Sequence, residues 1–372
     1  MIYYIFLSIL SIFGLYNIRN KFLSSIATIS FFIFLCLTYL NGSDWINYEK
    51  IYSEYSLSNF LTFPFEKAFS FYFSLFKGIG VDFWIFFIIT KIICLYIFIK
   101  ILKKFLPNYF LGLSVFYIQM GLYLIIDCPL RNLIAIALAF LSIDSLIVKK
   151  SKFFILYCIL AILFHNSAII LIFYFIFYFG VKVKKIKIVL WCLFFISFLF
   201  TNKNFILYLI HFFRFIPVLY FRILNYFYGP YSVESPLNIR LIEKYLITFS
   251  SLVYYKDIKE KYKFGEQMLI LNLFFLLCYT MAMTWAIFVR LSLYFRIFNI
   301  IILVYLIESF HNRILKYLSK IVYITYLFVN LYFLLKITNI YIPYTNYLEY
   351  IGKEKLSYEY RLELKKKLFN KN

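Results

Sequence analysis

Long apolar runs are the feature that most restricts how this chain can fold. Repeated segments of about 18 residues or more carry few charges, and a soluble domain has no means of burying so many of them. Hydrophobic residues make up 64% of the 372 positions. The runs are solid and do not alternate between apolar and polar residues, so they favour helices over the strands of a membrane barrel. The sequence therefore predicts an all-α polytopic integral membrane protein.

The apolar runs predict about 12 transmembrane helices. They form a single transmembrane domain, residues 1–348, followed by a basic C-terminal tail, residues 349–372. Placing Arg19 and Lys21 on the cytoplasmic side puts the polar stretch 41–59 outside. The run 63–81 is too polar for a span and predicts an interfacial or re-entrant helix. With both ends outside, the tail lies on the unfavourable side for its charge, so its side of the membrane stays open.

Lysine and arginine are sorted by side on this topology. The net charge of +22 does not indicate a nucleic-acid partner, because the lysines lie in short loops between apolar runs, as cytoplasmic anchors do. Most arginines fall on the outer side: Arg131, Arg214, Arg222, Arg240, Arg290 and Arg296. A guanidinium binds phosphate through paired hydrogen bonds. The sorting predicts an outward site for a phosphate-bearing substrate, and the alternative is that several arginines only reach toward lipid headgroups.

Arg131 and His165 occupy matching positions on two neighbouring helices. Pro129 suits a helix start, so Arg131 lies in the first turn of a helix that runs to about Val148. A lysine turn follows, and the apolar run 153–164 returns to His165. At 1.5 Å per residue, the two side chains lie roughly 27 Å and roughly 20 Å from the turn. Similar depth predicts a functional pair, and the alternative for His165 is a hydrogen-bonded structural histidine.

Three outer carboxylates are further candidates. Asp44, Glu49 and Glu66 follow the second and precede the third predicted span. One of them could deprotonate a sugar hydroxyl or hold an acceptor sugar, and the alternative is a solvated loop acid. No second histidine, paired cysteine or carboxylate lies at ligand spacing from His165, so neither a metal site nor a cofactor is expected.

Five short segments together carry a family resemblance. They are NGSDWINYEKIY at 41–52, RNLIAIALAFLS at 131–142, LAILFHNSAIIL at 160–171, FVRLSLYF at 288–295 and IPYTNYL at 342–348. Their order and spacing resemble the EpsG-like branch of the Wzy-type polysaccharide polymerases, which make bacterial capsule, exopolysaccharide and O-antigen. The family more often has Gln where this chain has Asn132.

The resemblance implies a metal-independent membrane glycosyltransferase of the multi-span, GT-C-like class. It implies a place in the bacterial cytoplasmic membrane with an outward active site. A growing glycan would pass from undecaprenyl pyrophosphate to the terminal sugar of an incoming lipid-linked repeat unit, with a chain-length regulator protein as a further partner. Which sugars are joined, and whether the product is capsule or O-antigen, stay open.

The resemblance and the polar residues together assign roles. Arg131 and Arg290 would stabilise the charge that grows on the leaving pyrophosphate. His165 and Asp44 are both open candidates for the base, and His165 could instead donate a hydrogen bond to the leaving phosphate. Four further residues are expected to bind substrate: Arg240, Arg296, Glu66 and Tyr294.

Other functions stay open at this point. An O-antigen ligase, or another lipid-linked sugar transferase, would use the same leaving group with a different acceptor. A transporter or flippase of lipid-linked oligosaccharides would show two related halves with Gly-broken or Pro-broken spans. The sequence has 10 Gly, 7 Pro and no visible repeat, which argues against a transporter. An acyltransferase built on His165 would need a cytoplasmic acyl donor, which the outward placement disfavours.

Overall fold

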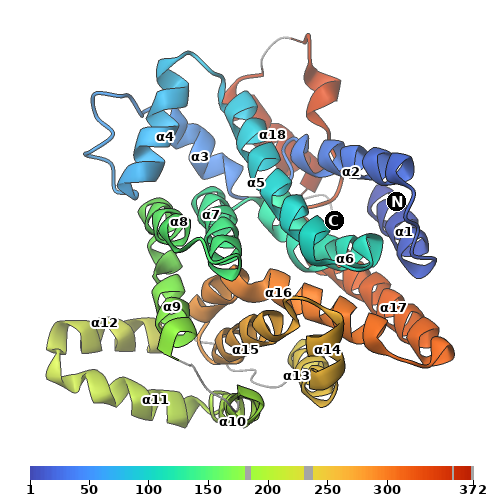
Figure 1. Ribbon diagram of the computed structural model, residues 1–372. Helices are drawn as coiled ribbons and strands as arrows, with labels where there is room; N and C mark the ends of the chain where they lie inside the picture. The colour runs from blue at the N-terminus through green and yellow to red at the C-terminus, as the bar shows by residue number, and fades with distance from the viewer. Residues whose placement is uncertain (181–185, 230–237, 354–355, 370–372) are drawn as a thin grey trace. The chain divides into compact units, whose positions relative to one another are not determined.

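The computed structural model describes residues 1–180, 186–229, 238–353 and 356–369 (Figure 1). All regular elements in these ranges are helices. The sequence predicts polar connections at 181–188 and 222–240, of which residues 181–185 and 230–237 lie outside the described residues. Residues 186–188 and 222–228 are helical instead.

The chain forms two compact units, and the first is built from both ends of the sequence. Unit 1 comprises Met1–Asn166 and Arg313–Asn372, and unit 2 comprises Ser167–Asn312. Unit 1 contains α1 Ile2–Leu15, α2 Lys21–Cys36, α3 Trp45–Tyr52, α4 Lys67–Gly78, α5 Phe83–Phe105, α6 Tyr109–Phe116, the π-helix η1 Tyr117–Asp127, α7 Leu130–Ile147, α8 Ser151–Phe164, α17 Arg313–Ile337, η4 Tyr347–Tyr350 and α18 Tyr358–Phe369.

Unit 2 is the continuous segment between the two parts of unit 1. It contains α9 Ile170–Gly180, α10 Ile186–Leu199, α11 Lys203–His211, η3 Phe212–Phe215, α12 Pro217–Tyr228, α13 Ile239–Val253, α14 Tyr255–Lys261, α15 Gly265–Met281 and α16 Ile287–Ser309. The short 3-10 turn η2, Asn166–Ile169, joins α8 to α9 along the chain.

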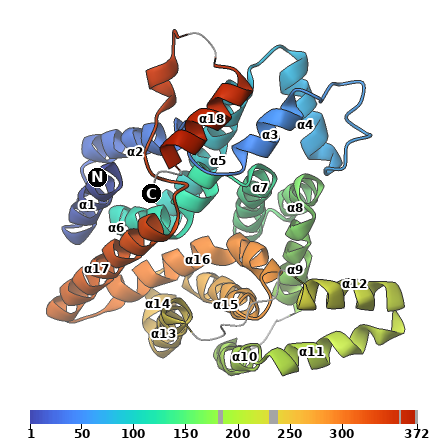
Figure 2. The ribbon, with the colours of Figure 1, turned by 180° about the vertical axis from the view of Figure 1, so that it is seen from behind.

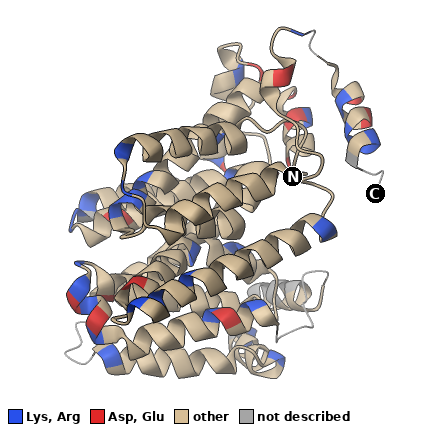
Figure 3. Ribbon diagram, turned by 90° about the vertical axis from the view of Figure 1, so that its right-hand side faces the viewer, with Lys and Arg blue, Asp and Glu red and all other residues tan. Residues whose placement is uncertain are grey.

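Among the described residues, five helical segments are long and apolar enough to cross a membrane. They are Phe83–Phe105, Tyr109–Asp127, Leu130–Ile147, Ile287–Ser309 and Arg313–Ile337. The pair α10 and α11 gives a sixth candidate that is bent by 99°. Charged residues gather at helix ends while the helix bodies are mostly uncharged (Figure 3). The protein is therefore a polytopic helical membrane protein, and the figure of about 12 spans stays a prediction.

The predicted hairpin at the lysine turn is confirmed. α7 begins directly after Pro129 and ends at Ile147, and α8 packs beside it (Figure 1). The chain reverses through Lys149, whose φ of 60° is left-handed. The hydroxyl of Ser142 donates to the carbonyl of Phe154 at 2.9 Å and joins the two helices.

The fourth predicted span differs from a regular helix. The sequence predicts one helix over 109–126, but the chain changes to π-helix at Tyr117 and keeps it to Asp127. Cys128 then adopts a left-handed conformation with φ 57°. Wider turns of this kind rotate the following side chains and often occur at functional sites. Here they present Asp127 to the loop that precedes α3, where Ser43 binds it.

Two charged residues in apolar runs have partners that the sequence left open. Asp144, near the end of α7, forms an ion pair with Lys104 at the end of α5. Lys91 is fully buried in α5, where its ammonium donates to Thr38 Oγ1 at 2.7 Å. The pair of Lys104 with Asp144 places the basic ends of α5 and of the α7–α8 hairpin on one side, as the predicted topology requires.

Candidate functional site

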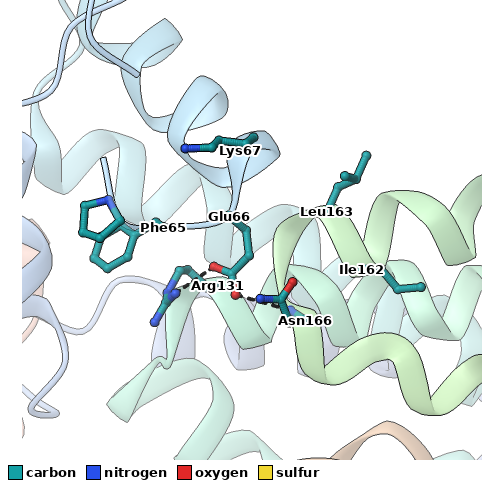
Figure 4. Close-up of a pocket in the computed structure, with 8 residues that line it drawn as sticks. Phe65, Glu66, Lys67, Arg131, Ile162, Leu163 and Asn166 are labelled. Atoms are coloured by element: carbon teal, nitrogen blue, oxygen red, sulfur yellow. Dashed lines mark hydrogen bonds and ion pairs between the residues drawn. The ribbon is translucent and has the colours of Figure 1, made fainter. Parts of the chain in front are cut away.

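The carboxylate of Glu66 brings Arg131 and His165 together in unit 1. Arg131 Nη1 donates to Glu66 Oε2 at 2.7 Å. His165 Nδ1 lies 3.0 Å from Glu66 Oε1. The backbone N–H of Asn166 donates to the same oxygen at 3.3 Å, and Figure 4 shows Glu66 between Arg131 and Asn166. Residues predicted to lie at one depth therefore share a single acidic partner.

Local structure explains why these three side chains can meet. Glu66 precedes α4 in an extended conformation, and its carboxylate makes no capping bond to that helix. It is therefore free to reach across to α7 and α8. Arg131 is the second residue of α7, and His165 leaves α8 with extended backbone angles. Each side chain thus lies where a helix begins or ends.

Aromatic groups complete the surroundings of Arg131. Its guanidinium carbon lies 4.4 Å from the ring centroid of Phe65, a cation–π contact. The hydroxyl of Tyr48, on α3, interacts electrostatically with Arg131. The Arg131 side chain is 28% exposed, whereas that of Glu66 is 9% exposed. The guanidinium is consequently the more accessible partner of the ion pair and retains donors for a ligand.

A pocket of about 430 Å³ opens at this cluster (Figure 4). One part of its wall is charged and comes from Lys67, Glu66 and Arg131. Another part is apolar and comes from Ile162 and Leu163 of α8. The pocket therefore offers cationic donors and a hydrocarbon surface within one small space.

The electrostatics of Glu66 fix its protonation state. Burial raises the pKa of this carboxyl, but the hydrogen bond from His165 and the charge and hydrogen bond of Arg131 outweigh burial and lower the pKa to about 2. Glu66 is thus a carboxylate at neutral pH and can only accept hydrogen bonds. A neutral His165 must then carry its proton on Nδ1, which leaves Nε2 as an acceptor.

Asp44 lies in unit 1, one helix away from this pocket. It directly precedes α3, and both Asp44 and Arg131 act electrostatically on the Tyr48 hydroxyl. The neighbouring Ser43 donates to Asp127 Oδ1 through both its backbone N–H, at 2.8 Å, and its hydroxyl, at 2.7 Å. Glu49 is not a solvated loop acid, because its side chain is 9% exposed and ion-paired with Arg361.

The remaining predicted residues belong to unit 2. Arg240 is exposed in the first turn of α13 and, together with Arg296, acts electrostatically on the buried Lys244. Lys244 forms an ion pair with Glu243 at 2.9 Å. The guanidinium carbon of Arg296 lies 5.7 Å from the ring centroid of Tyr279. Two predicted arginines thus share one basic cluster.

Arg290 and Tyr294 are four residues apart on α16 but differ in exposure. Arg290 is exposed, whereas Tyr294 is fully buried. The hydroxyl of Tyr294 lies 2.9 Å from Ser167 Oγ, and this hydrogen bond joins α16 to the start of unit 2. The surroundings of Tyr294 therefore favour a supporting position over direct contact with a sugar.

Sequence reasoning named Glu66 but not its position between Arg131 and His165, and it missed Tyr48, Phe65 and Asn166 as neighbours. Glu66 is 65 residues from Arg131 and 99 residues from His165 along the sequence. No local sequence pattern can therefore predict these contacts. The described residues contain no group of three or more His, Cys, Asp or Glu side chains that could hold a metal ion. The metal-independent mechanism nevertheless stays a prediction.

Comparison with known proteins identifies the family. A model of the EpsG family matches residues 21–351 of the 372. No curated protein and no solved structure matches the chain. The family match extends over Glu66, Arg131 and His165 and over the basic cluster of unit 2. Membership indicates a membrane protein of the polysaccharide-polymerase type. This integral membrane protein therefore belongs to the EpsG family.

Proposed function

We propose that this protein polymerises a polysaccharide from lipid-linked repeat units at the outer face of the bacterial cytoplasmic membrane. The growing glycan passes from undecaprenyl pyrophosphate to the terminal sugar of an incoming lipid-linked repeat unit. The observation that carries the proposal is the contact of one carboxylate, Glu66, with both Arg131 and His165 beside a pocket with an apolar wall.

The reaction needs a base, a leaving-group partner and a site for lipid. The acceptor hydroxyl forms a bond to the anomeric carbon of the donor sugar, and the bond from that carbon to the pyrophosphate oxygen breaks. In the proposed mechanism His165 Nε2 accepts the proton of the hydroxyl, and Glu66 stabilises the resulting imidazolium. Glu66 is then a positioning residue. Asp44 remains the second candidate for the base.

The leaving pyrophosphate carries the negative charge that develops in this step. Arg131 holds Glu66 through Nη1 and has further N–H donors for a phosphate oxygen. The cations of unit 2, Arg240, Arg290 and Arg296, keep the phosphate-binding role that the sequence predicts. Ile162 and Leu163 suit the first isoprene units of the lipid, because hydrocarbon binds favourably to such a surface.

Replacement of His165 tests the proposal. We expect His165→Ala to insert in normal amounts, to abolish long glycan and to let single lipid-linked repeats accumulate on the outer side. The measurement is a glycan gel, normalised to protein in the membrane fraction, together with the sidedness of the accumulated lipid. Repeats that accumulate inside would indicate a flippase, and normal chains that fail to reach lipid A would indicate a ligase. Normal chain lengths would remove His165 from the mechanism.

A further inference from the structure

We propose that helix α18 is a strap that positions the candidate site, acting through Arg361 and Lys365 on α3 and on the loop 41–44. This inference rests on the proposed function, because polymerisation supplies its readout. Figure 2 shows α18 beside α3, and both helices belong to unit 1.

The first anchor is an ion pair between Arg361 and Glu49. Arg361 Nε donates to Glu49 Oε2 at 3.2 Å, and Nη2 contacts Oε1. The Trp84 indole N–H donates to the same Oε1 at 3.1 Å. The Arg361 and Glu49 side chains are 12% and 9% exposed. A charge pair buried to this degree tolerates the loss of either partner poorly, since the remaining charge would stay desolvated.

The second anchor is Lys365, one helical turn further along. Its ammonium donates to the carbonyl of Gly42 and lies 5.3 Å from the ring centroid of Trp45. Asp44 and Asp127 both act electrostatically on this ammonium. In the first turn of α18, the hydroxyl of Tyr358 donates to the carbonyl of Ile46 at 3.2 Å, which adds a third anchor.

The anchors share one face of α18. Tyr358, Arg361 and Lys365 are spaced three and four residues apart, which places them on one side of a helix. The charged residues of the other face are exposed: Glu359, Glu363, Lys366 and Lys367. Arg361 and Lys365 thus face α3 and its loop, whereas Lys366 and Lys367 lie on the exposed face. The exposed lysines provide matched controls within the same helix.

Two routes lead from the strap to Arg131. α3 carries Tyr48, whose hydroxyl interacts electrostatically with Arg131. The loop 41–44 holds Asp127 through Ser43, and Asp127 lies four residues before Arg131. The loop has little freedom there, since a Cβ on Gly42 would come 2.4 Å from the carbonyl oxygen of Ile126. Displacement of α18 would therefore disturb both supports of Arg131.

Charge exchange across the first anchor tests the strap. We expect Arg361→Glu alone, or Glu49→Arg alone, to lower kcat for polymerisation by about 10-fold to 100-fold, because small misplacements of catalytic groups cost that much. The double variant should recover to within a few fold of wild type, and KM for the lipid-linked repeat should change little throughout. Lys366→Glu and Lys367→Glu on the exposed face are the controls. The measurement uses the full-length protein in vesicles containing lipid-linked repeat units.

Release of α18 is followed separately by protease cleavage after the tail lysines. Wild-type kcat in a variant whose tail has become cleavable would overturn the strap. Equal losses of kcat in the control variants and in Arg361→Glu would overturn the strap as well. If Arg361→Glu does not accumulate, Lys365→Met tests the second anchor by the same two measurements. An inactive wild-type protein under these conditions would contradict the proposed function instead, so the two failures are distinguishable.

Discussion

Glu66 uses both oxygens of one carboxylate, and an amide cannot replace it. Oε2 accepts from Arg131, while Oε1 meets His165 and Asn166. In Glu66→Gln one of these positions becomes an NH₂ group, which faces another donor. The loss of a charge-assisted hydrogen bond costs about 1.5–3 kcal/mol, so we expect polymerisation to fall about 10-fold to 150-fold. The glycan gel measures this, with Glu54→Gln in the exposed segment after α3 as the control.

Lys365 gives the strap a pH dependence. Burial lowers the pKa of Lys365 to about 8, although Asp127 and Asp44 act in the opposite direction. A released tail would have the ordinary pKa of 10.5. Between these two values the released form binds more protons, so docking of α18 becomes more favourable as pH rises through 8. The neutral amine still has N–H groups that can donate to the Gly42 carbonyl, so the anchor persists while the cost of burying the charge disappears. We expect the tail to be better protected from protease at pH 9 than at pH 7.

Lys365→Met provides the control for this pH dependence. It removes the titrating group and keeps an unbranched side chain over Trp45, so protection of the tail should no longer change between the two pH values. The same rise in protection in the Met variant would assign the effect to a different group.

Sequence reasoning at this scale succeeded where a residue lies in a regular element. The depths of Arg131 and His165 follow from counting helical rise along α7 and α8, and both meet the same carboxylate. The partner of Glu49 could not be predicted, because Arg361 lies 312 residues away along the chain. Long-range pairs of this kind depend on how helices pack and leave no periodic pattern.

Among the elements, the α7–α8 hairpin was predictable because its signals are local: Pro129 before α7, apolar residues throughout and a lysine turn. The π-helix η1 was not predictable. Its wider turns carry the same apolar composition as an α-helix, and packing decides which hydrogen bonds form. The chain bends by 99° between α10 and α11, and the side chain of Asn202 caps α11 there.

The two ends of this hairpin use different cations, which gives a test at the scale of the element. In Arg131→Lys the charge remains but the paired donors are lost, so activity should fall nearly as far as in Arg131→Ala. Exchange of Lys149, Lys150 and Lys152 together for arginine should change neither insertion nor chain length. Glycan gels of the three variants measure the chain lengths that each one produces. A wild-type glycan ladder from Arg131→Lys would show that Arg131 contributes only its positive charge.

For the whole molecule, the contact of α18 with α3 leads to a prediction about the side of the membrane on which the C-terminal tail lies. Two bonded helices lie on one side of a membrane, so an even number of crossings separates Tyr52 from Tyr358. The sequence placed α3 outside and left the tail open because its charge argues for the inside. We predict that the tail lies outside with α3, because Arg361 and Lys365 have partners on α3 and its loop.

Cysteine labelling tests this arrangement in intact cells. After replacement of the native cysteines, Ser53→Cys and Ser357→Cys should both react with an impermeant thiol reagent, because both positions are exposed. Lys150→Cys, at the lysine turn, should react only after the membrane is opened. Labelling of Ser53→Cys without Ser357→Cys would separate α18 from α3.

Unit 1 is built from both ends of the chain, so its two parts are synthesised at different times. The ribosome makes Glu49 long before Arg361, and 312 positions separate them. At about 5–20 residues per second, this interval lasts about 15–60 s. A nascent chain therefore contains the whole Glu66 cluster while Glu49 still lacks its arginine. If the proposed strap positions the site, the site is complete only when the residues made after unit 2 return to α3, and we expect unfinished chains to lack polymerising activity.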